Sequence, residues 1–254
     1  MTAGMSGIAT VDDALAAADG VDGWMSPDQI VELHRAASTT VAGEQIVEIG
    51  SFRGRSTVVL ATSAPVGVTV VAIDPHAGND RGPQEIEGFA AEAGDDHQRF
   101  LANLARAGVS DRVRHVRTYS DQAHGAVDGP IDVLLIDGAH RYAPARQDIH
   151  DWGRRVAPGG VLLIHDSFSS IGVTLAIGRE LLVGKRFRYV GRARSLAVYH
   201  ADLDGSRKAR LGNATRQLAQ LPWFLRNLAI KVTLSAGLGG PLERITGERP
   251  EWPY

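Results

Sequence analysis

Apolar runs rich in β-branched residues recur along the chain and alternate with segments of helical periodicity. The five runs are QIVEIG (45–50), VTVVAID (68–74), RVRHVRT (112–118), IDVLLID (131–137) and GVLLIHD (160–166). Short apolar runs separated by helices are typical of strands in a parallel sheet that is buried on both faces. Helical patterns over 56–64, 97–108 and 142–156 lie between them. The chain is therefore predicted to form a parallel sheet covered by helices on both faces.

The remaining segments complete this sheet and add helices at both ends of the chain. A helical segment, 174–184, precedes the short strands FRYVG (187–191) and SLAVYHA (195–201), which are close enough to form an antiparallel hairpin. We therefore predict an α/β fold with a Rossmann-like, doubly wound, seven-stranded and mostly parallel sheet. The predicted division is an N-terminal helical segment over 1–44, the α/β domain over 45–200, and a helical, basic C-terminal extension over 201–254.

Two local signals suggest where elements begin and end. Ser26 and Pro27 precede an apolar-periodic stretch, so a helix is predicted over 26–38 with Ser26 as its cap and Pro27 in its first turn. The sequence APGG (157–160) is expected to end the preceding helix and to lead into the next strand.

Two segments have unusual charge. Residues 78–98 hold six acidic residues and one basic residue, and they interrupt the second crossover. A loop of this length suggests a lid over a site, or else a disordered, solvated insertion. Residues 205–240 hold six basic residues and no acidic one, interleaved with LPWFLRNLAI. This segment is expected to pack on a partner subunit; a membrane surface or its own domain are the alternatives. Because LPWFLRNLAI is short and Pro222 limits a continuous helix, a homodimer is favoured over a membrane contact.

Composition excludes several classes of protein. A formal net charge of -2 and a pI of about 6.5 argue against a general nucleic-acid binder. The chain has no cysteine, so any metal must be bound by oxygen and imidazole ligands. The N-terminus lacks the pattern of a secretory signal, and no apolar stretch is long enough to span a membrane. We expect a soluble, cytoplasmic protein.

Acidic side chains follow two of the apolar runs. Asp137 ends one run and Asp166 another; His140 lies three residues after the first, and His165 directly precedes the second. Neighbouring parallel strands lie about 4.8 Å apart, so both carboxylates would meet at the edge of the sheet where such folds bind ligands. Two carboxylates and two imidazoles could hold a divalent metal and a general base. Alternatively, Asp137 caps a turn with Gly138 and Asp166 caps a helix.

The loop after the first strand is suited to close approach by a ligand. In VEIGSFRGRST, Gly50 and Gly54 lie between a strand and a helix, whose N-terminus offers N–H donors. Glu48 lies just inside the strand end, and Asp74 ends the second strand, where an acid can accept hydrogen bonds from ribose hydroxyls. The pattern is GxxxG rather than GxGxxG, which disfavours a nicotinamide dinucleotide.

These motifs together resemble a known family. VEIGSFRGRST, VVAIDPH, LLIDGAH and APGGVLLIHD are similar to motifs of the class I S-adenosylmethionine-dependent methyltransferases over roughly residues 24–200. The resemblance implies that S-adenosylmethionine is the cofactor. The residues that it assigns to cofactor binding are Trp24, Glu48, Gly50, Ser51, Arg53, Gly54, Ser56, Thr57, Asp74, His76, Ser120 and Asp121.

The resemblance also implies separate roles within this set. Trp24 would close over the methionine end, and Asp74 would bind the ribose. His76 would lie near the ribose or the adenine. Ser120 and Asp121 match the turn that contacts adenine, although the same pair could equally be a plain helix cap.

Within that family, DGxH followed by an acidic pair resembles the metal-dependent O-methyltransferases that act on sugars. The resemblance implies that Asp137, His165 and Asp166 bind a divalent metal and that His140 is the general base. His165 departs from the acidic residue usual at its position. Because imidazole suits softer ions, this difference would shift the preference from magnesium toward manganese. From their position just after His140, Arg141 and Tyr142 are expected either to contact the substrate or to be simply exposed to solvent.

The sequence thus predicts a metal-dependent O-methyltransferase that moves a methyl group from S-adenosylmethionine to a hydroxyl of a sugar or saccharide. The acceptor would be a small molecule or an oligosaccharide, and no nucleic-acid partner is expected. A phenolic, catechol-like acceptor is an alternative within the same fold. An NAD-dependent oxidoreductase and a non-catalytic protein that binds S-adenosylmethionine are the alternatives from other classes.

Overall fold

A computed structural model describes residues 9–77 and 89–237 of the chain. The strands are β1 (Gln45–Ile49), β2 (Thr69–Ile73), β3 (Val113–Val116), β4 (Ile131–Ile136), β5 (Val156–Ile164), β6 (Arg188–Ala193) and β7 (Leu196–His200). The α-helices are α1 (Val11–Ala18), α2 (Pro27–Ser38), α3 (Arg55–Ser63), α4 (Phe89–Arg106), α5 (Tyr142–Asp151), α6 (Ile171–Glu180), α7 (Arg207–Leu218) and α8 (Leu221–Ser235).

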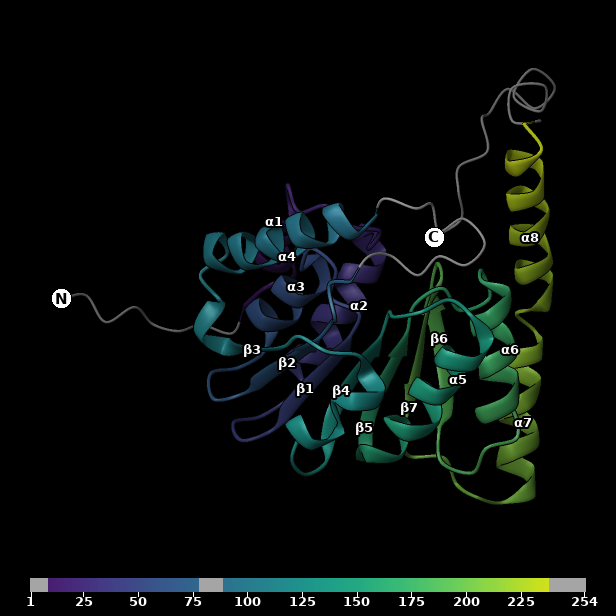
Figure 1. The fold of residues 1–254 in the computed structure, drawn as a ribbon. Helices are drawn as coiled ribbons and strands as arrows, with labels where there is room; N and C mark the ends of the chain where they lie inside the picture. The colour runs from purple at the N-terminus through teal and green to yellow at the C-terminus, as the bar shows by residue number, and fades with distance from the viewer. Residues whose placement is uncertain (1–8, 78–88, 238–254) are drawn as a thin grey trace.

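The strands form one seven-stranded sheet in the order β3-β2-β1-β4-β5-β7-β6 (Figure 1). Pairing is parallel from β3 to β5, and β7 runs antiparallel to both β5 and β6. The predicted doubly wound sheet and its terminal hairpin are therefore confirmed. The strand order reverses between β1 and β4. In open α/β sheets, ligands bind in the crevice at such a reversal, between the loops that leave the two strands.

Residues of the buried strands alternate between two hydrophobic clusters, one on each face of the sheet. Ile46 belongs to the cluster that includes residues of α1, α2, α3 and α4, whereas Val47 and Ile49 belong to the cluster that includes residues of α5 and α6. Alternation along a strand sends successive side chains to opposite faces. Both faces are thus buried, which explains why the strands are continuous apolar runs in the sequence.

The N-terminal helices belong to the first of these clusters. Ala14 and Ala18 of α1 and Leu33 of α2 are fully buried in it. Ser26 precedes α2 and Pro27 is its first residue, as the sequence predicts. The cap works through Gln29, whose side chain accepts a hydrogen bond from the backbone N–H of Ser26.

The C-terminal helices cover the edge of the sheet at β6 (Figure 1). Asn213 of α7 is buried; its amide oxygen accepts from Tyr189 N at 2.7 Å and its Nδ2 donates to Phe187 O at 3.0 Å. These bonds occupy backbone groups that an edge strand would otherwise expose. Pro222 separates α7 from α8, as expected, and lies in the first turn of α8. One face of this segment therefore packs on its own domain.

Two boundary predictions were wrong. The loop predicted over 78–98 ends earlier, because Phe89 already begins α4, an 18-residue helix with a clear apolar face; residues 78–88 of the expected lid lie outside the described residues. The APGG sequence does not separate helix from strand, because β5 begins at Val156 and contains it. A register shift in the pairing with β4 accommodates the glycines there. Within the described ranges, no helix is long and apolar enough to cross a membrane.

Candidate active site

Strands β4 and β5 are parallel neighbours, so Asp137, His165 and Asp166 lie at the same edge of the sheet. Backbone pairing continues one residue past each strand, with Asp137 N donating to Ile49 O and His165 N donating to Ile136 O. The loop after β1 touches this edge directly. Gly50 has φ +85°, and a Cβ there would lie 2.3 Å from Asp137 O. Only glycine fits, because any side chain would push the loop away from the carboxylates.

Asp137, His140 and Asp166 come together at this edge, with potential ligand atoms all within 4.8 Å of one another. His140 Nε2 lies 2.8 Å from Asp166 Oδ2. The buried His165 ring places Nδ1 2.9 Å from Asp137 Oδ1 and 3.4 Å from Asp166 Oδ2. Neither of its ring nitrogens has a hydrogen bond of good geometry among the described residues. The four predicted residues therefore form one cluster. His140, which the sequence analysis assigns as the base, is one of the three residues whose atoms could bind a metal together, whereas His165, the expected ligand, is not in that group.

The charges in this cluster depend strongly on one another. Although burial disfavours a cationic His165, the carboxylates of Asp137 and Asp166 raise the pKa of its imidazole to about 10. Burial also opposes charge on His140, but its hydrogen bond to Asp166 raises the pKa of this ring above the ordinary value. Burial alone would raise the pKa of Asp166, yet the two imidazoles hold it well below its usual range. Positive charge is therefore strongly favoured between these carboxylates.

The loop after β5 has a strained backbone. Asp166 and Phe168 both have φ +55°, a left-handed conformation that costs a residue other than glycine about 1–3 kcal/mol. Ser170 Oγ donates to His140 O at 3.2 Å. A Cβ at Gly172, in the first turn of α6, would lie 2.2 Å from His140 O. The loop after β5 thus fixes the position of the turn that carries His140.

Asp74 accepts hydrogen bonds from backbone N–H groups. Its Oδ2 accepts from Ser51 N at 2.9 Å and from Phe52 N at 2.8 Å, and its Oδ1 accepts from His76 N at 2.7 Å. Phe52 and His76 both have φ +46°, so the carboxylate stabilises two left-handed turns. Asp74 thus holds the glycine loop against the end of β2. One lone pair of its Oδ1 remains for the predicted ribose contact.

Three further residues of the predicted cofactor set contact one another. Glu48 is fully buried on the α3 face of the sheet, where the hydroxyls of Ser56 and Thr57 donate to its carboxylate. Burial raises the pKa of Glu48 to about 8, although these two hydrogen bonds act to lower it. Gly54, with φ +87°, precedes the helix to which both hydroxyls belong. Glu48, Ser56 and Thr57 therefore join β1 to α3 beneath the loop.

The remaining predicted cofactor residues lie around this loop. Arg53 forms ion pairs with Asp96 at 2.6 Å and Asp22 at 2.7 Å, so it connects the loop to α4 and to the N-terminal segment. The ring of Trp24 lies 5.0 Å from the ring of Phe52. The guanidinium of Arg53 also lies over the ring of Phe52, 5.0 Å from its centroid, so Arg53 and Trp24 both contact this loop residue.

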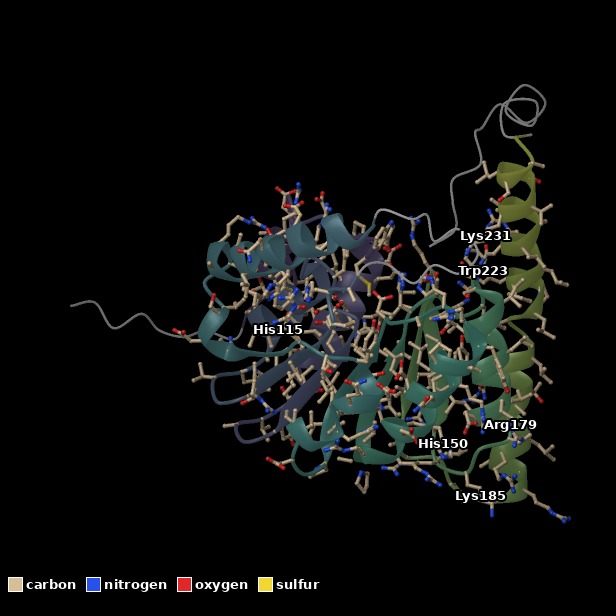
Figure 2. The ribbon with its side chains drawn as sticks, in the orientation of Figure 1. His115, His150, Arg179, Lys185, Trp223 and Lys231 are labelled. Atoms are coloured by element: carbon tan, nitrogen blue, oxygen red, sulfur yellow. The ribbon has the colours of Figure 1, made fainter. Side chains whose placement is uncertain are left out.

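The imidazole of His76 is buried and belongs to an aromatic group whose other two histidines are half-buried. Its Nε2 lies 2.8 Å from Phe52 O, and its ring packs 5.0 Å from His97 and from His115, which Figure 2 labels. Burial, with smaller contributions from the neighbouring histidines, lowers the pKa of His115 to about 4. This group supports the turn at the end of β2.

Ser120 and Asp121 form a short 3-10 turn after β3, and Asp121 is exposed. Ser120 Oγ donates to Asp148 Oδ1 at 2.5 Å, and burial raises the pKa of Asp148 to about 6 although this bond lowers it. Sequence reasoning missed Asp148, which looks like an ordinary polar position of α5. It also missed Ser170 and Gly172, although the SFSS sequence after Asp166 is a recognisable helix start.

Two observations fit the groups that the resemblance implies. The hydroxyl of Ser51 is buried without a hydrogen-bond partner among the described residues, so a polar group of a bound cofactor would satisfy it. The carboxylates of Asp137 and Asp166 together with the imidazole of His140 form a mixed oxygen and nitrogen donor set. Such a set suits magnesium or manganese.

Comparison with known proteins agrees with this fold. Residues 47–167 match a family described as a methyltransferase domain. The structure of cofactor-bound Rv0187 from MTB superimposes with a TM-score of 0.54 at 22% identity, covering 75% of this chain and 88% of that one. The O-methyltransferase NovP gives 0.56 at 14% identity, covering 71% and 83%. The O-methyltransferase TomG from Streptomyces achromogenes, in complex with SAM, gives 0.50 at 18% identity, covering 76% and 89%. The chain therefore has the Rossmann-like fold of these methyltransferases, and residues 47–167 are similar in sequence to a methyltransferase domain.

Proposed function

We propose that the protein is an S-adenosylmethionine-dependent O-methyltransferase whose reaction takes place at the Asp137, His140 and Asp166 cluster. The single observation that carries the proposal is the contact between this cluster and the glycine loop, because Gly50 lies against the backbone of Asp137. A donor bound along that loop would present its methyl group beside the cluster. The match of residues 47–167 to a methyltransferase domain supports the same reading.

The donor would lie across the ends of β1 and β2. Ser51 would offer its buried hydroxyl, and Asp74 the remaining lone pair of a carboxylate that already fixes the loop. Trp24 and Phe52 would form an apolar wall at the loop. Methyl transfer requires the acceptor oxygen to lie in line behind the transferred carbon, so holding both molecules rigidly is the main contribution of these residues.

Asp137, Asp166 and either His140 or His165 would hold a divalent cation. Such an ion lowers the pKa of a hydroxyl that it binds and so makes an aliphatic alcohol a usable nucleophile at neutral pH. His140, at the turn after β4, would accept the proton from the acceptor hydroxyl at Nδ1, while Asp166, paired with Nε2, orients the ring and stabilises the imidazolium that forms. The burial of Asp166 and His165 would keep water from this side of the reacting oxygen.

The acceptor is proposed to be a sugar or saccharide hydroxyl. The support is the resemblance of DGAH and HD to the metal-dependent sugar O-methyltransferases, together with the donor set. The length, the His-Asp pair and the basic C-terminal segment further resemble the mycobacterial enzyme that caps methylmannose polysaccharides, so a methylated mannoside is one acceptor to test. A catechol is the alternative.

Methyl transfer from S-adenosylmethionine to a panel of monosaccharides, mannosides and catechols, with Mg²⁺, with Mn²⁺ and with EDTA, tests the proposal. We expect transfer to a saccharide that EDTA abolishes and that added metal restores. Transfer to catechol alone would correct the acceptor. Full turnover in EDTA would refute the metal role, and binding of NAD in place of S-adenosylhomocysteine would refute the reaction.

We further propose that the outer face of α7 and α8 pairs two copies of the chain in a cytoplasmic homodimer. Leu211, Leu218, Leu225 and Val232 are spaced seven residues apart and are 47–69% exposed, which is unusual for large apolar side chains in line. Figure 1 shows these helices as the outer edge of the described domain. Changing Leu218 and Leu225 to Glu should yield monomers by sedimentation, whereas Val66→Glu, elsewhere on the surface, should not. Binding of the intact protein to anionic vesicles would instead support the membrane alternative.

A further inference from the structure

The left-handed residues Asp166 and Phe168 need support from outside their own loop. Within five residues this loop holds the candidate ligand Asp166, two left-handed backbones and the N-cap of α6. Such conformations persist only where the surrounding structure holds them in place. The hydrogen bond from Ser167 N to Ser195 O supports one side of the loop.

Helix α8 supports the other side. Asn227 is fully buried, and its Nδ2 donates to Phe168 O at 3.0 Å. Lys231 Nζ donates to the next carbonyl, Ser169 O, at 3.1 Å. Asn227 and Lys231 are four positions apart (i, i+4), so both lie on one face of the helix. Figure 2 labels Lys231 and Trp223 where α8 meets the rest of the domain.

The supported loop is in turn joined to His140. Asp166 Oδ2 lies 2.8 Å from His140 Nε2, and Ser170 Oγ donates to His140 O at 3.2 Å. Gly172 allows α6 to pack directly on that carbonyl. A continuous set of hydrogen bonds therefore runs from α8, through the loop after β5, to both a candidate ligand and the candidate base.

We propose that Asn227 and Lys231 of α8 are positioning residues for the active site, holding the loop from Asp166 to Ser170 in its reactive conformation. This inference rests on the proposed function, in which Asp166 and His140 act on the acceptor. Helix α8 lies outside the residues that match the methyltransferase domain, so the C-terminal extension supplies this support in addition to that domain. Lys231 acts through its bond to the loop; its side chain is partly buried, and burial lowers the pKa of its ammonium group.

The test compares Asn227→Ala with Asn213→Ala. Asn213 is also buried and also bonds a backbone carbonyl, but its partners are Phe187 and Tyr189 at the edge strand, not the loop after β5. Two measurements are made on the full chain: hydrogen exchange of peptides covering 165–172, and Mn²⁺ binding by calorimetry in the presence of S-adenosylhomocysteine. We expect Asn227→Ala to speed exchange over 165–172 and to weaken Mn²⁺ binding by about tenfold or more. Asn213→Ala should change neither, even at an equal loss of thermal stability.

If Asn227→Ala fails to fold, a second pair of variants tests whether α8 holds the loop after β5. Lys231→Met keeps an unbranched apolar stem and removes the donor, and Lys208→Met makes the same change at an exposed position of α7. Faster exchange over 165–172 in Lys231→Met alone is expected. Unchanged exchange in both Asn227→Ala and Lys231→Met would overturn the inference. Failure of the wild type to bind Mn²⁺ would refute the proposed metal site instead, and the exchange measurement would still decide the role of α8.

Discussion

The two halves of the candidate ligand-binding edge use their carboxylates differently. At the ends of β1 and β2, Asp74 accepts from three backbone N–H groups, and Glu48 accepts from two hydroxyls. At the ends of β4 and β5, Asp137 and Asp166 face two imidazoles, and one of these, His165, has no hydrogen bond of good geometry at either nitrogen within the described ranges. The first half is held largely by its own bonds, whereas the second half keeps capacity to bind a cation.

Under the proposed function, this difference would separate cofactor binding from methyl transfer. A carboxylate that fixes a loop, such as that of Asp74, contributes to binding by keeping the loop rigid. A carboxylate grouped with a second one and with imidazoles carries charge that an ion or a proton must balance. We therefore expect changes in the first half to weaken cofactor binding and stability, and changes in the second half to reduce turnover and metal binding.

The largest expected effect is that of Asp137→Ala. The change would remove a proposed ligand and leave the remaining charges unbalanced, so methyl transfer and Mn²⁺ binding should both be abolished. Affinity for S-adenosylhomocysteine should stay near that of the wild type, as measured by calorimetry. Asp111→Ala, at an exposed acid before β3, is the control and should change neither quantity. Retained Mn²⁺ binding in Asp137→Ala would remove the distinction between the two halves.

His140→Ala should slow turnover by about 10²–10⁴-fold, the usual contribution of a positioned base. If His140 acts as the base, Mn²⁺ and S-adenosylhomocysteine should still bind. The 2.8 Å contact with Asp166 also allows a ligand role, and loss of Mn²⁺ binding in this variant would assign it. Because residues of one catalytic unit are not additive, His140→Ala combined with Asp137→Ala should be little worse than Asp137→Ala alone.

Asp74→Ala should weaken binding of S-adenosylhomocysteine by about 5–150-fold, which corresponds to about 1–3 kcal/mol for polar groups left unpaired. The three backbone N–H groups lose their acceptor as well, so thermal stability should fall. Metal affinity, which belongs to the other half of the edge, should stay the same. A loss of stability with unchanged cofactor affinity would restrict Asp74 to its structural role.

Asp148→Asn should leave metal and cofactor binding alone and change only the stability, in a way that depends on pH. Burial raises the pKa of Asp148 to about 6 from an ordinary 3.8. Between these two pH values the unfolded chain has lost the proton and the folded chain has kept it, so the free energy of unfolding falls as the pH rises. Asparagine does not ionise and still accepts from Ser120. The variant should be as stable as the wild type near pH 4 and more stable above pH 6, by about 1–3 kcal/mol. Urea unfolding at both pH values measures this, with exposed Asp128→Asn as control. An equal difference at the two pH values would contradict it.

Local sequence pattern predicted the sheet and the location of the candidate site. Strand and helix periodicities are local properties, and the ends of parallel strands must share an edge, so Asp74, Asp137 and Asp166 were placed correctly from the sequence alone. The proposed division at residues 44 and 200 stays a prediction, although α1 and α2 share one hydrophobic cluster with the sheet. The start of α4 was missed because Gly94, Asp95 and Asp96, which follow its first turn, resemble a loop.

Tertiary structure alone decided which partner each polar side chain has. Asn227 and Phe168 are 59 positions apart, and Ser120 and Asp148 are 28 apart, so no local pattern could pair them. Likewise, the sequence contains both His140 and His165 beside the aspartates, but only the turn after β4 and the left-handed Asp166 bring His140 against that carboxylate. Hydrogen bonding and charge depend on distance and burial in space, whereas the sequence directly records only neighbours along the chain.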